Sequence, residues 1–313
     1  MTKDTPLKAG KVAVVAVVGR TNAGKSTLVN RLVGEKVSIV SPVAQTTRNT
    51  VRGIVADPRG QLVLLDTPGL HKAVGALGTL LNRMARRSSA GADIVCAVFD
   101  AAREPQLEDV GWMQRIAGEN REKAVFVLNK ADLSPFFESM FHESWDRCAA
   151  GRGVKFTPKW VKCSAIAPDG GKAVLDALFE FAEEGEKLFD DDIATDYPRR
   201  MTIADSIREK YLARLHSEVP HELGVRVVKL DESEGPPKTW DVAVEVLVNR
   251  ASQKPIAIGR RAETVKYVRK CAERELSELF GVRVRLNLLV KASPNWMKNA
   301  RLLAEMGYLG ELM

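Results

Sequence analysis

The sequence of 313 residues is poor in cysteine and histidine, with four of each. The cysteines are widely spaced and form no CxxC pair, so neither a zinc site nor a disulfide framework is indicated. The histidines are too scattered to suggest a metal cluster. We therefore expect free thiols in a reducing compartment. The four positions are Cys96, Cys148, Cys163 and Cys271.

Long apolar runs are missing as well. The first apolar segment, VAVVAVV (12–18), is far shorter than the ~20 residues that a transmembrane helix needs. It ends at Gly19, and no small-residue cleavage site follows, so we expect no signal peptide. These absences predict a cytoplasmic protein. Peripheral contact with a membrane stays open.

The net charge of +7 is mild but unevenly distributed. Residues up to 197 carry +1, whereas the remaining residues to 313 carry +6. Between these regions, residues 183–198 hold seven acidic residues and one Lys, which is typical of an exposed linker. The length also suits two domains. We predict a disordered tail at 1–10, a first domain at 11–182, an acidic linker at 183–198, and a second domain with a C-terminal tail at 199–313.

Short apolar runs alternate with helical patterns through the first domain. QLVLLD (61–66), DIVCAVFD (93–100) and KAVFVLNK (123–130) are apolar on both faces, as expected for parallel strands covered by helices. This alternation predicts an α/β domain with a doubly wound, mostly parallel sheet.

The second domain has a different pattern. Its predicted order is helix, strand, strand, helix, strand, and the valines at 242, 244, 246 and 248 share one face of a strand. A helix predicted from about residue 262 to residue 280 stops at Gly281. The sequence therefore predicts a smaller α+β domain whose sheet buries one face.

The segment GRTNAGKS (19–26) matches G-x-x-x-x-G-K-[ST] between an apolar strand and a helix, which is the setting of a P-loop. Its glycines let backbone N–H groups converge on phosphate oxygens, and the helix dipole adds positive charge. We expect Lys25 to reach the β- and γ-phosphates and Ser26 to ligate Mg²⁺. The residues predicted around the phosphates are Gly19, Asn22, Ala23, Gly24, Lys25, Ser26 and Thr27.

Three further segments, DTPG (66–69), NKAD (129–132) and CSA (163–165), each at the end of a predicted strand, favour GTP or GDP as the ligand. In DTPG (66–69), Asp66 is expected to hold Mg²⁺ through water, and the Gly69 N–H to touch the γ-phosphate. In NKAD (129–132), the Asp132 carboxylate can accept two guanine N–H donors, a pair that adenine lacks. Such strand ends gather at one edge of an α/β sheet. The residues predicted at the base are Asn129, Lys130, Asp132, Ser164 and Ala165, the last through its N–H to guanine O6.

This set of segments resembles the Ras-like, translation-factor-related GTPases. In such proteins a Thr between the P-loop and the DxxG segment completes the Mg²⁺ shell when GTP is bound. In SPVAQTTRN (41–49) we favour Thr47 over Thr46 for this role. The predicted metal ligands are Ser26, Thr47 and Asp66, and the predicted catalytic residues are Lys25, Thr47, Asp66 and Gly69.

One element of the Ras-type site is missing. Ras-type enzymes carry a Gln after the DxxG glycine to orient the attacking water, and Leu70 stands there in this sequence. We therefore expect slow intrinsic hydrolysis. In related GTPases an Asn at the position of Asn22 helps to bind K⁺, which replaces an arginine finger. Asn22 either does the same here or only shapes the turn.

The positive charge of the second domain gathers in one stretch. Residues 249–270 hold seven basic residues and one Glu, a pattern that indicates binding to a phosphate backbone. SQK (252–254) and IAIG (256–259), together with IREKYLARLHSEVPHELGVRV (207–227), QTTR, DTPG and NKAD, resemble the Era family over essentially the whole chain. The resemblance implies a GTPase domain followed by a KH domain. It also implies binding of ribosomal RNA near the 3′ end of the small-subunit rRNA, assistance to 30S maturation, contact with the membrane and a monomeric state.

The KH loop departs from the family pattern. KH domains clamp the nucleic-acid backbone with a GxxG loop, usually GKGG in this family, and the loop here is GRRA (259–262). Two glycines are replaced, which makes close backbone approach harder, while two arginines can hold phosphate by charge. The predicted RNA-binding residues are Lys254, Gly259, Arg260, Arg261 and Lys266.

Two other functions remain open from the sequence. One is a GTP-regulated peripheral membrane or protein-interaction module with weakened RNA selectivity. The other is an RNA-modification GTPase, although the sequence offers no catalytic constellation beyond the nucleotide site. The strand–loop–helix setting of residues 256–272 favours a KH fold over an amphipathic membrane helix.

Overall fold

The computed structural model describes residues 9–41, 47–69, 75–215 and 219–308. The chain divides into two compact units. The first contains Met1–Ser38 and Thr47–Asp196, and the second contains Ile39–Thr46 and Tyr197–Met313. The predictions made for Thr46 and Leu70 lie outside the described residues.

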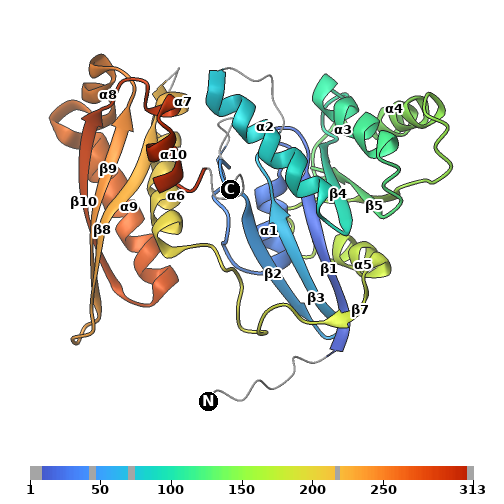
Figure 1. Cartoon of the computed structure of the whole chain (residues 1–313), viewed down its shortest axis with the longest axis horizontal. Coiled ribbons are helices and arrows are strands. Elements are labelled where there is room, and N and C mark those ends of the chain that lie inside the picture. The colour runs from blue at the N-terminus through green and yellow to red at the C-terminus, as the bar shows by residue number, and fades with distance from the viewer. Residues whose placement is uncertain (1–8, 42–46, 70–74, 216–218, 309–313) are drawn as a thin grey trace. The chain divides into compact units, whose positions relative to one another are not determined.

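The first unit is a seven-stranded, mostly parallel sheet with helices on both faces, so the predicted fold class is confirmed (Figure 1). The strand order is β2-β3-β1-β4-β5-β6, with β2 antiparallel to β3 and β7 antiparallel to the start of β1. The strands are β1 (Ala9–Val18), β2 (Val51–Asp57), β3 (Gly60–Asp66), β4 (Ile94–Asp100), β5 (Ala124–Asn129), β6 (Lys159–Lys162) and β7 (Glu183–Glu186). The helices are α1 (Lys25–Val33), α2 (Gly75–Ala90), α3 (Leu107–Gly118), α4 (Glu138–Ala150) and α5 (Lys172–Phe181).

The central strand β1 is buried on both sides because its side chains alternate between two cores. Val15 and Val17 pack into the core that α1 and α5 cover. Ala16 and Val18 pack into the other core, which contains the fully buried Trp112 of α3. Burying an aliphatic side chain of this size contributes about 1.5–3 kcal/mol, so the two cores hold the sheet edge in place.

The acidic stretch at 183–198 differs from the exposed linker that its charge predicts. Its first four residues form β7 and pair with β1. Further along, the Ala194 carbonyl accepts a hydrogen bond from the Ile54 N–H at 2.8 Å, and the Phe189 carbonyl accepts one from the Gln61 side chain at 2.8 Å. Through this pairing the stretch belongs to the first unit, which extends to Asp196. The charge of the sequence does not reveal backbone pairing, so the linker prediction missed it. Residues 9 and 10, which were predicted to belong to a tail, form the start of β1.

The second unit is a three-stranded sheet with helices on one face, as the one-sided pattern predicts. Strand β9 runs parallel to β10 and antiparallel to β8. The side chains of Val242 and Val244 on β9 pack in the same core as Ile207 and Val268 of the helices, whereas Leu289 on the outer face is 58% exposed. The elements are α6 (Arg199–Leu212), α7 (Val219–Glu222), β8 (Gly224–Ser233), β9 (Thr239–Val248), α8 (Lys254–Ile258), α9 (Glu263–Phe280), β10 (Arg283–Ala292) and α10 (Ala300–Glu305).

Two details of the second unit bear on its function. Helix α9 ends at Gly281 in the left-handed conformation, as predicted, and α8 directly precedes the GRRA loop. None of the described helices combines the length and the apolar character that crossing a membrane requires.

Candidate nucleotide site and nucleic-acid interface

The P-loop connects β1 to α1 and brings a buried ammonium to the edge of the sheet. The side chain of Lys25 is buried, and its Nζ donates to the carbonyl oxygen of Arg20 at 2.9 Å. Burial lowers the pKa of Lys25 to about 8, and the nearby Asp66 carboxylate partly offsets this effect. Gly24 caps α1 in a left-handed conformation without a side-chain hydrogen bond, which leaves the dipole of the helix facing the loop.

The residues predicted to hold a metal lie together. Asp66 is fully buried, and neither of its carboxylate oxygens has a hydrogen-bond partner among the described residues. The hydroxyl oxygens of Ser26 and Thr47 are 2.9 Å apart. Burial raises the pKa of Asp66, while the Lys25 ammonium acts against this shift. An oxygen-only donor set around a buried carboxylate fits Mg²⁺, whose charge would further stabilise the ionised form of Asp66.

Gly69 approaches the P-loop too closely to be replaced. A Cβ atom at this position would lie 2.7 Å from the backbone nitrogen of Thr21 and 2.8 Å from Nζ of Lys25. The preceding Thr67 hydroxyl donates to the carbonyl of Val17 at 2.8 Å, which ties the DTPG segment to β1. The structure therefore holds Gly69 beside Lys25, where its predicted contact with the γ-phosphate requires it.

The predicted base-binding residues also converge. The Asn129 side chain donates to the Ala23 carbonyl at 2.8 Å and accepts from the Ala165 N–H at 3.0 Å, so it joins the P-loop to the CSA segment. The Ser164 hydroxyl donates to the Asp132 carboxylate at 2.5 Å. Because the Ala165 N–H already donates to Asn129, its predicted contact with guanine O6 would share or replace that bond.

Asn22 is exposed and adopts a left-handed backbone conformation, with φ of 62°. Asn tolerates this conformation better than most residues. This geometry suits a residue that shapes the turn, and it leaves the side chain at the surface of the P-loop. The role of Asn22 in K⁺ binding stays a prediction.

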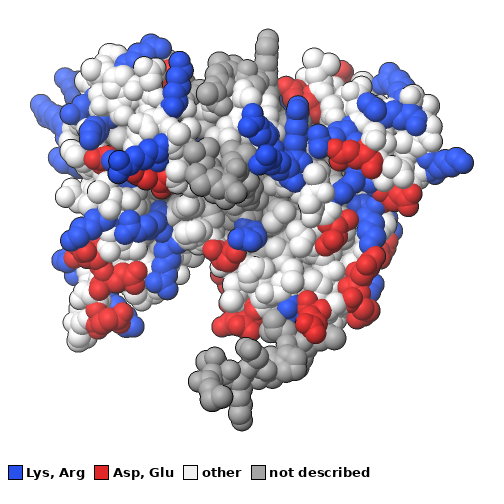
Figure 2. Space-filling model, in the orientation of Figure 1, with Lys and Arg blue, Asp and Glu red and all other residues white. Residues whose placement is uncertain are grey.

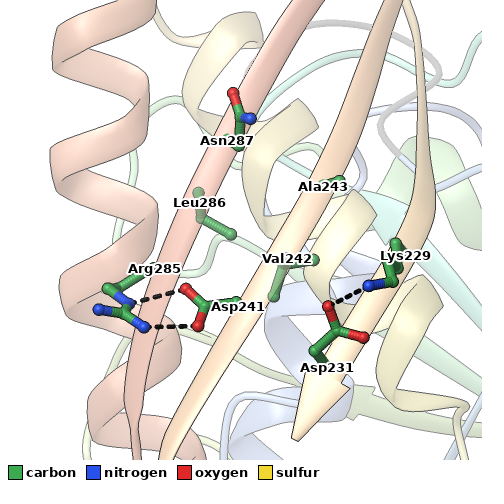
Figure 3. Close-up of a pocket in the computed structure, with 8 residues that line it drawn as sticks. All are labelled: Lys229, Asp231, Asp241, Val242, Ala243, Arg285, Leu286 and Asn287. Carbon is green, nitrogen blue, oxygen red and sulfur yellow. Dashed lines mark hydrogen bonds and ion pairs between the residues drawn. The ribbon is translucent and has the colours of Figure 1, made fainter.

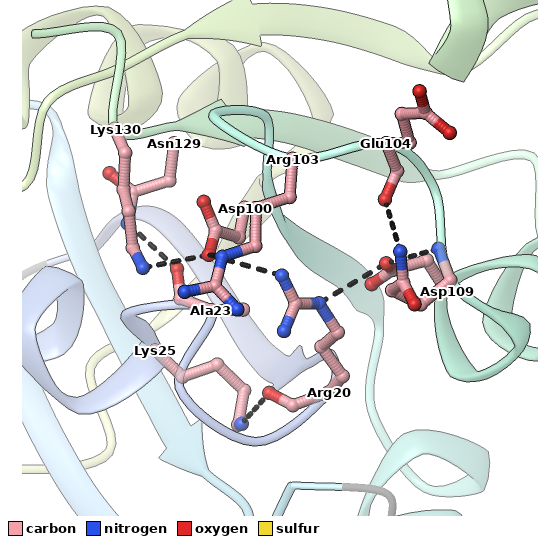
Figure 4. A network of polar contacts seen from close by, with 10 residues as sticks. Arg20, Ala23, Lys25, Asp100, Arg103, Glu104, Asp109, Asn129 and Lys130 are labelled. Atoms are coloured by element: carbon pink, nitrogen blue, oxygen red, sulfur yellow. Dashed lines mark hydrogen bonds and ion pairs between the residues drawn. The ribbon is translucent and has the colours of Figure 1, made fainter. Parts of the chain in front are cut away.

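Several residues at this site carry no prediction from the sequence. Arg31 on α1 donates to the carbonyls of Ala165 at 3.2 Å and Ile166 at 3.1 Å, so it fixes the loop expected to hold the base. Asp100 also carries no prediction, and it forms ion pairs with Arg20, likewise not predicted, and with the predicted Lys130 (Figure 4). One signal was available, because Asp100 ends an apolar strand just as Asp66 and Asn129 do.

The GRRA loop keeps an unusual backbone although two of the three glycines of the family pattern are replaced. Arg261 and Ala262 both have positive φ, at 51° and 61°, which costs each residue about 1–2 kcal/mol. Gly259 cannot change, since its φ is 79° and a Cβ would lie 2.3 Å from Oγ1 of Thr264. The turn before α9 therefore lowers the stability of the folded unit, and strained backbone of this kind is often found at functional sites.

The basic residues predicted to bind RNA surround this turn and are exposed. Ala262 caps α9 without a side-chain hydrogen bond, so the positive end of the helix dipole faces the same loop. Ile256 of α8 lies three residues before the loop in the sequence, and its side chain is 50% exposed, so it adds an apolar contact surface. Figure 2 shows Lys and Arg side chains over this end of the second unit. The exposed basic residues are Arg250, Lys254, Arg260, Arg261, Lys266, Arg269 and Lys270.

The sheet of the second unit has a separate hollow of about 270 Å³ on its outer face (Figure 3). Its charged side chains pair with one another. Arg285 donates to Asp241 at 2.7 Å, and the Lys229 ammonium lies 2.6 Å from Asp231. These pairs neutralise the hollow, which therefore offers little to attract a charged ligand.

Two family models match the chain, one in each unit. Residues 14–130 match a family described as 50S ribosome-binding GTPase, and residues 218–297 match the KH domain. The first match contains the P-loop and ends at Lys130, and the second contains the GRRA loop.

Curated relatives and solved structures match nearly the whole chain. GTPase Era of Fusobacterium nucleatum is 34% identical over 96% of this chain and 100% of its own length. GTPase Era of Geobacter sp. (strain M21) is 35% identical over 94% of this chain and 96% of its own length. A crystal structure of Era in complex with MgGDPNP and nucleotides 1506–1542 of 16S ribosomal RNA superposes with a TM-score of 0.86, at 31% identity over 96% of this chain and 99% of that one. The crystal structure of a point variant of Aquifex aeolicus Era bound to GDP·AlF4⁻ superposes with a TM-score of 0.85, at 31% identity over 95% of this chain and 99% of that one.

The lowered pKa of Lys25 predicts that GDP binding takes up a proton. In the free protein the ammonium has lost part of its charge at about pH 8, and bound phosphate restores it, so the affinity falls as pH rises through this range. Calorimetry in buffers of different ionisation enthalpy, between about pH 7 and about pH 8.5, measures the uptake.

Two variants serve as comparisons. Lys25→Arg abolishes the uptake because Arg stays protonated, whereas Lys162→Arg, at an exposed ion pair on β6, keeps it. Equal uptake in wild type and in Lys25→Arg would contradict the assignment.

Proposed function

The chain belongs to the Era family of GTPases, and we propose that it acts as a GTP-driven switch that binds 16S ribosomal RNA near its 3′ end and assists maturation of the 30S subunit. The observation that carries this proposal is the similarity to Era in complex with MgGDPNP and 16S rRNA nucleotides 1506–1542, which extends over both units. The monomeric state, the cytoplasmic location and contact with the membrane stay predictions.

GTP hydrolysis at this site transfers the γ-phosphoryl group to water and needs no protein nucleophile. Lys25 stabilises the negative charge that develops on the phosphate oxygens. Asp66, Ser26 and Thr47 would hold Mg²⁺, which neutralises charge on the β- and γ-phosphates when bound. Gly69, held against the P-loop, would donate its N–H to the γ-phosphate, so its segment could respond to the presence of that group.

The base segment supplies the preference for guanine. Asp132, oriented by the Ser164 hydroxyl at 2.5 Å, accepts the N–H donors of guanine that adenine lacks. Asn129 contacts both Ala23 and Ala165, which gives the base and phosphate segments a shared anchor.

We expect hydrolysis to be faster in K⁺ than in Na⁺, because Leu70 stands where Ras-type enzymes have Gln and because an Asn at the position of Asn22 helps to bind K⁺ in related GTPases. The steady-state GTPase rate in the two chlorides at equal ionic strength measures this effect. Asn22→Ala should remove the difference between the two salts. Equal wild-type rates in both salts would rule out this role for K⁺.

The second unit is suited to a phosphate backbone. Arg260 and Arg261 project from the strained turn, and the dipole of α9 favours anions at the same place. An RNA strand held mainly by charge has an affinity that depends steeply on salt. We infer that the GRRA loop grips RNA through these arginines and not through the close backbone approach that GKGG allows.

Replacing Arg260 and Arg261 together by Ala should weaken binding to a fragment of the 16S rRNA 3′ end by about 10–100-fold. It should also reduce the slope of log affinity against log salt by about 1–2, because up to two phosphate contacts are lost. Fluorescence anisotropy across a salt series gives both quantities. Arg285→Ala, on the outer face of the sheet, is the matched control. An unchanged slope would exclude this loop as the contact.

Crosslinking in cells followed by sequencing of the bound RNA tests the function itself. Enrichment at the 3′ end of 16S rRNA, lost in the double Ala variant, is the expected result. Recovery of no RNA, with the protein in the membrane fraction, would overturn the proposal in favour of a GTP-regulated membrane module.

A further inference from the structure

Arg20, the second residue of the P-loop, places its guanidinium between two buried carboxylates (Figure 4). Its Nη2 lies 3.0 Å from Oδ2 of Asp100, and its Nε lies 3.2 Å from Oδ2 of Asp109. The side chains of Asp100 and Asp109 are 2% and 0% exposed, and that of Arg20 is 13% exposed. Charges buried to this degree persist only when they are paired.

The network reaches both halves of the nucleotide site. On the phosphate side, the carbonyl oxygen of Arg20 accepts a hydrogen bond from Nζ of Lys25 at 2.9 Å. On the base side, Oδ2 of Asp100 also accepts from Nζ of Lys130 at 2.8 Å. Arg20 therefore contacts the lysine expected at the phosphates through its backbone carbonyl, and its guanidinium contacts Asp100, which in turn binds the lysine of the NKAD segment.

The anchor of this network lies at the start of α3. Oδ2 of Asp109 accepts a hydrogen bond from the backbone N–H of Gln106 at 3.0 Å, so the first turn of α3 holds the carboxylate in place. Arg suits the bridging position because its planar fork can serve two carboxylates at once, whereas a Lys ammonium is a point charge.

Resting on the proposed GTPase function, we propose that Arg20 is a positioning residue for the nucleotide. Its ion pairs with Asp100 and Asp109 hold the P-loop and the NKAD lysine in the spacing that phosphate and base require together. Arg20 need not touch the nucleotide for this role. Loss of the network should weaken GDP and GTP analogues alike, because both ligands span the two segments.

Two conservative variants test the network by different routes. Arg20→Lys keeps the charge and loses the fork, whereas Asp109→Asn keeps the shape and loses the charge. Each should weaken the Kd for GDP and for a non-hydrolysable GTP analogue by about tenfold, and the double variant by less than the product of the two effects. Glu119→Gln, which breaks an ion pair between Glu119 and Arg115 at the other end of α3, is the matched control and should leave both affinities unchanged.

A pH series separates positioning from simple stabilisation. Burial raises the pKa of Asp109 to about 6, and the charged groups around it are Arg20, Lys25, Asp100 and Glu108. Protonation on going from about pH 7.5 to about pH 5.5 removes the charge that pairs with Arg20. At the lower pH the affinity of wild type for GDP should therefore fall toward the affinity of Asp109→Asn, and the difference between the two proteins should become small.

Stability should move in the opposite direction. Because the pKa of Asp109 is higher in the folded than in the unfolded chain, its protonation below about pH 6 favours the folded state. A role in stability alone therefore predicts no loss of affinity at the lower pH. Thermal unfolding, measured on the same samples, reports this effect separately.

The outcomes are distinct. If wild type binds GDP tightly and the two variants bind it equally well, whatever their melting temperatures, the positioning role is overturned. If wild type itself fails to bind guanine nucleotides, the proposed function fails, whatever the variants do.

Discussion

The nucleotide site depends on a buried ammonium and a buried carboxylate, Lys25 and Asp66, at the carboxyl edge of the first sheet. Burial pushes the pKa of Lys25 down and that of Asp66 up, so each group is drawn toward its neutral form. A nucleotide phosphate reverses the first effect and a divalent cation reverses the second. Burying such charges without partners costs free energy, so binding of the nucleotide and the metal should stabilise the folded site.

The rest of the first unit serves to hold that edge. Two hydrophobic cores fix β1 between its neighbours, so the loop between Val18 and Lys25 starts and ends at defined points. Polar links then join the separate strand ends, through Asn129 to the loop that contains Ala165 and through Asp100 to Arg20. Preorganisation of this type lowers the cost of ordering the site when the ligand binds.

The second unit relies on a different physical principle. Its cations are exposed and gather around one strained turn, so they act together through their charge and remain sensitive to salt. In the first unit the main charges at the nucleotide site are few and buried, and Asp100 and Asp109 are held by contacts with the guanidinium of Arg20. The uneven net charge of the sequence reflects this division, because residues 249–270 hold seven basic residues against one Glu.

Much of this could be predicted from the sequence, because the P-loop, DTPG and NKAD combine rare spacing with a strand-end position. The strands with continuous apolar runs and helix α9 were also predictable. Strand β7 was not, since its glutamates join the sheet through their backbone and look like a linker by charge. The pairing of Arg20 with Asp109 was hidden as well, because the two residues are far apart in sequence and meet only when the sheet brings α3 beside the P-loop.

The most direct test of this account is the dependence of GTP affinity on Mg²⁺ in wild type and in Asp66→Asn. Wild type should bind GTP about 10–100-fold more tightly with Mg²⁺ than with a chelator, because the unpartnered carboxylate gains a cation. Asp66→Asn should lose most of this difference and still bind GTP when the metal is removed. An equal Mg²⁺ effect in both proteins would contradict the role of the buried Asp66 carboxylate in holding the metal.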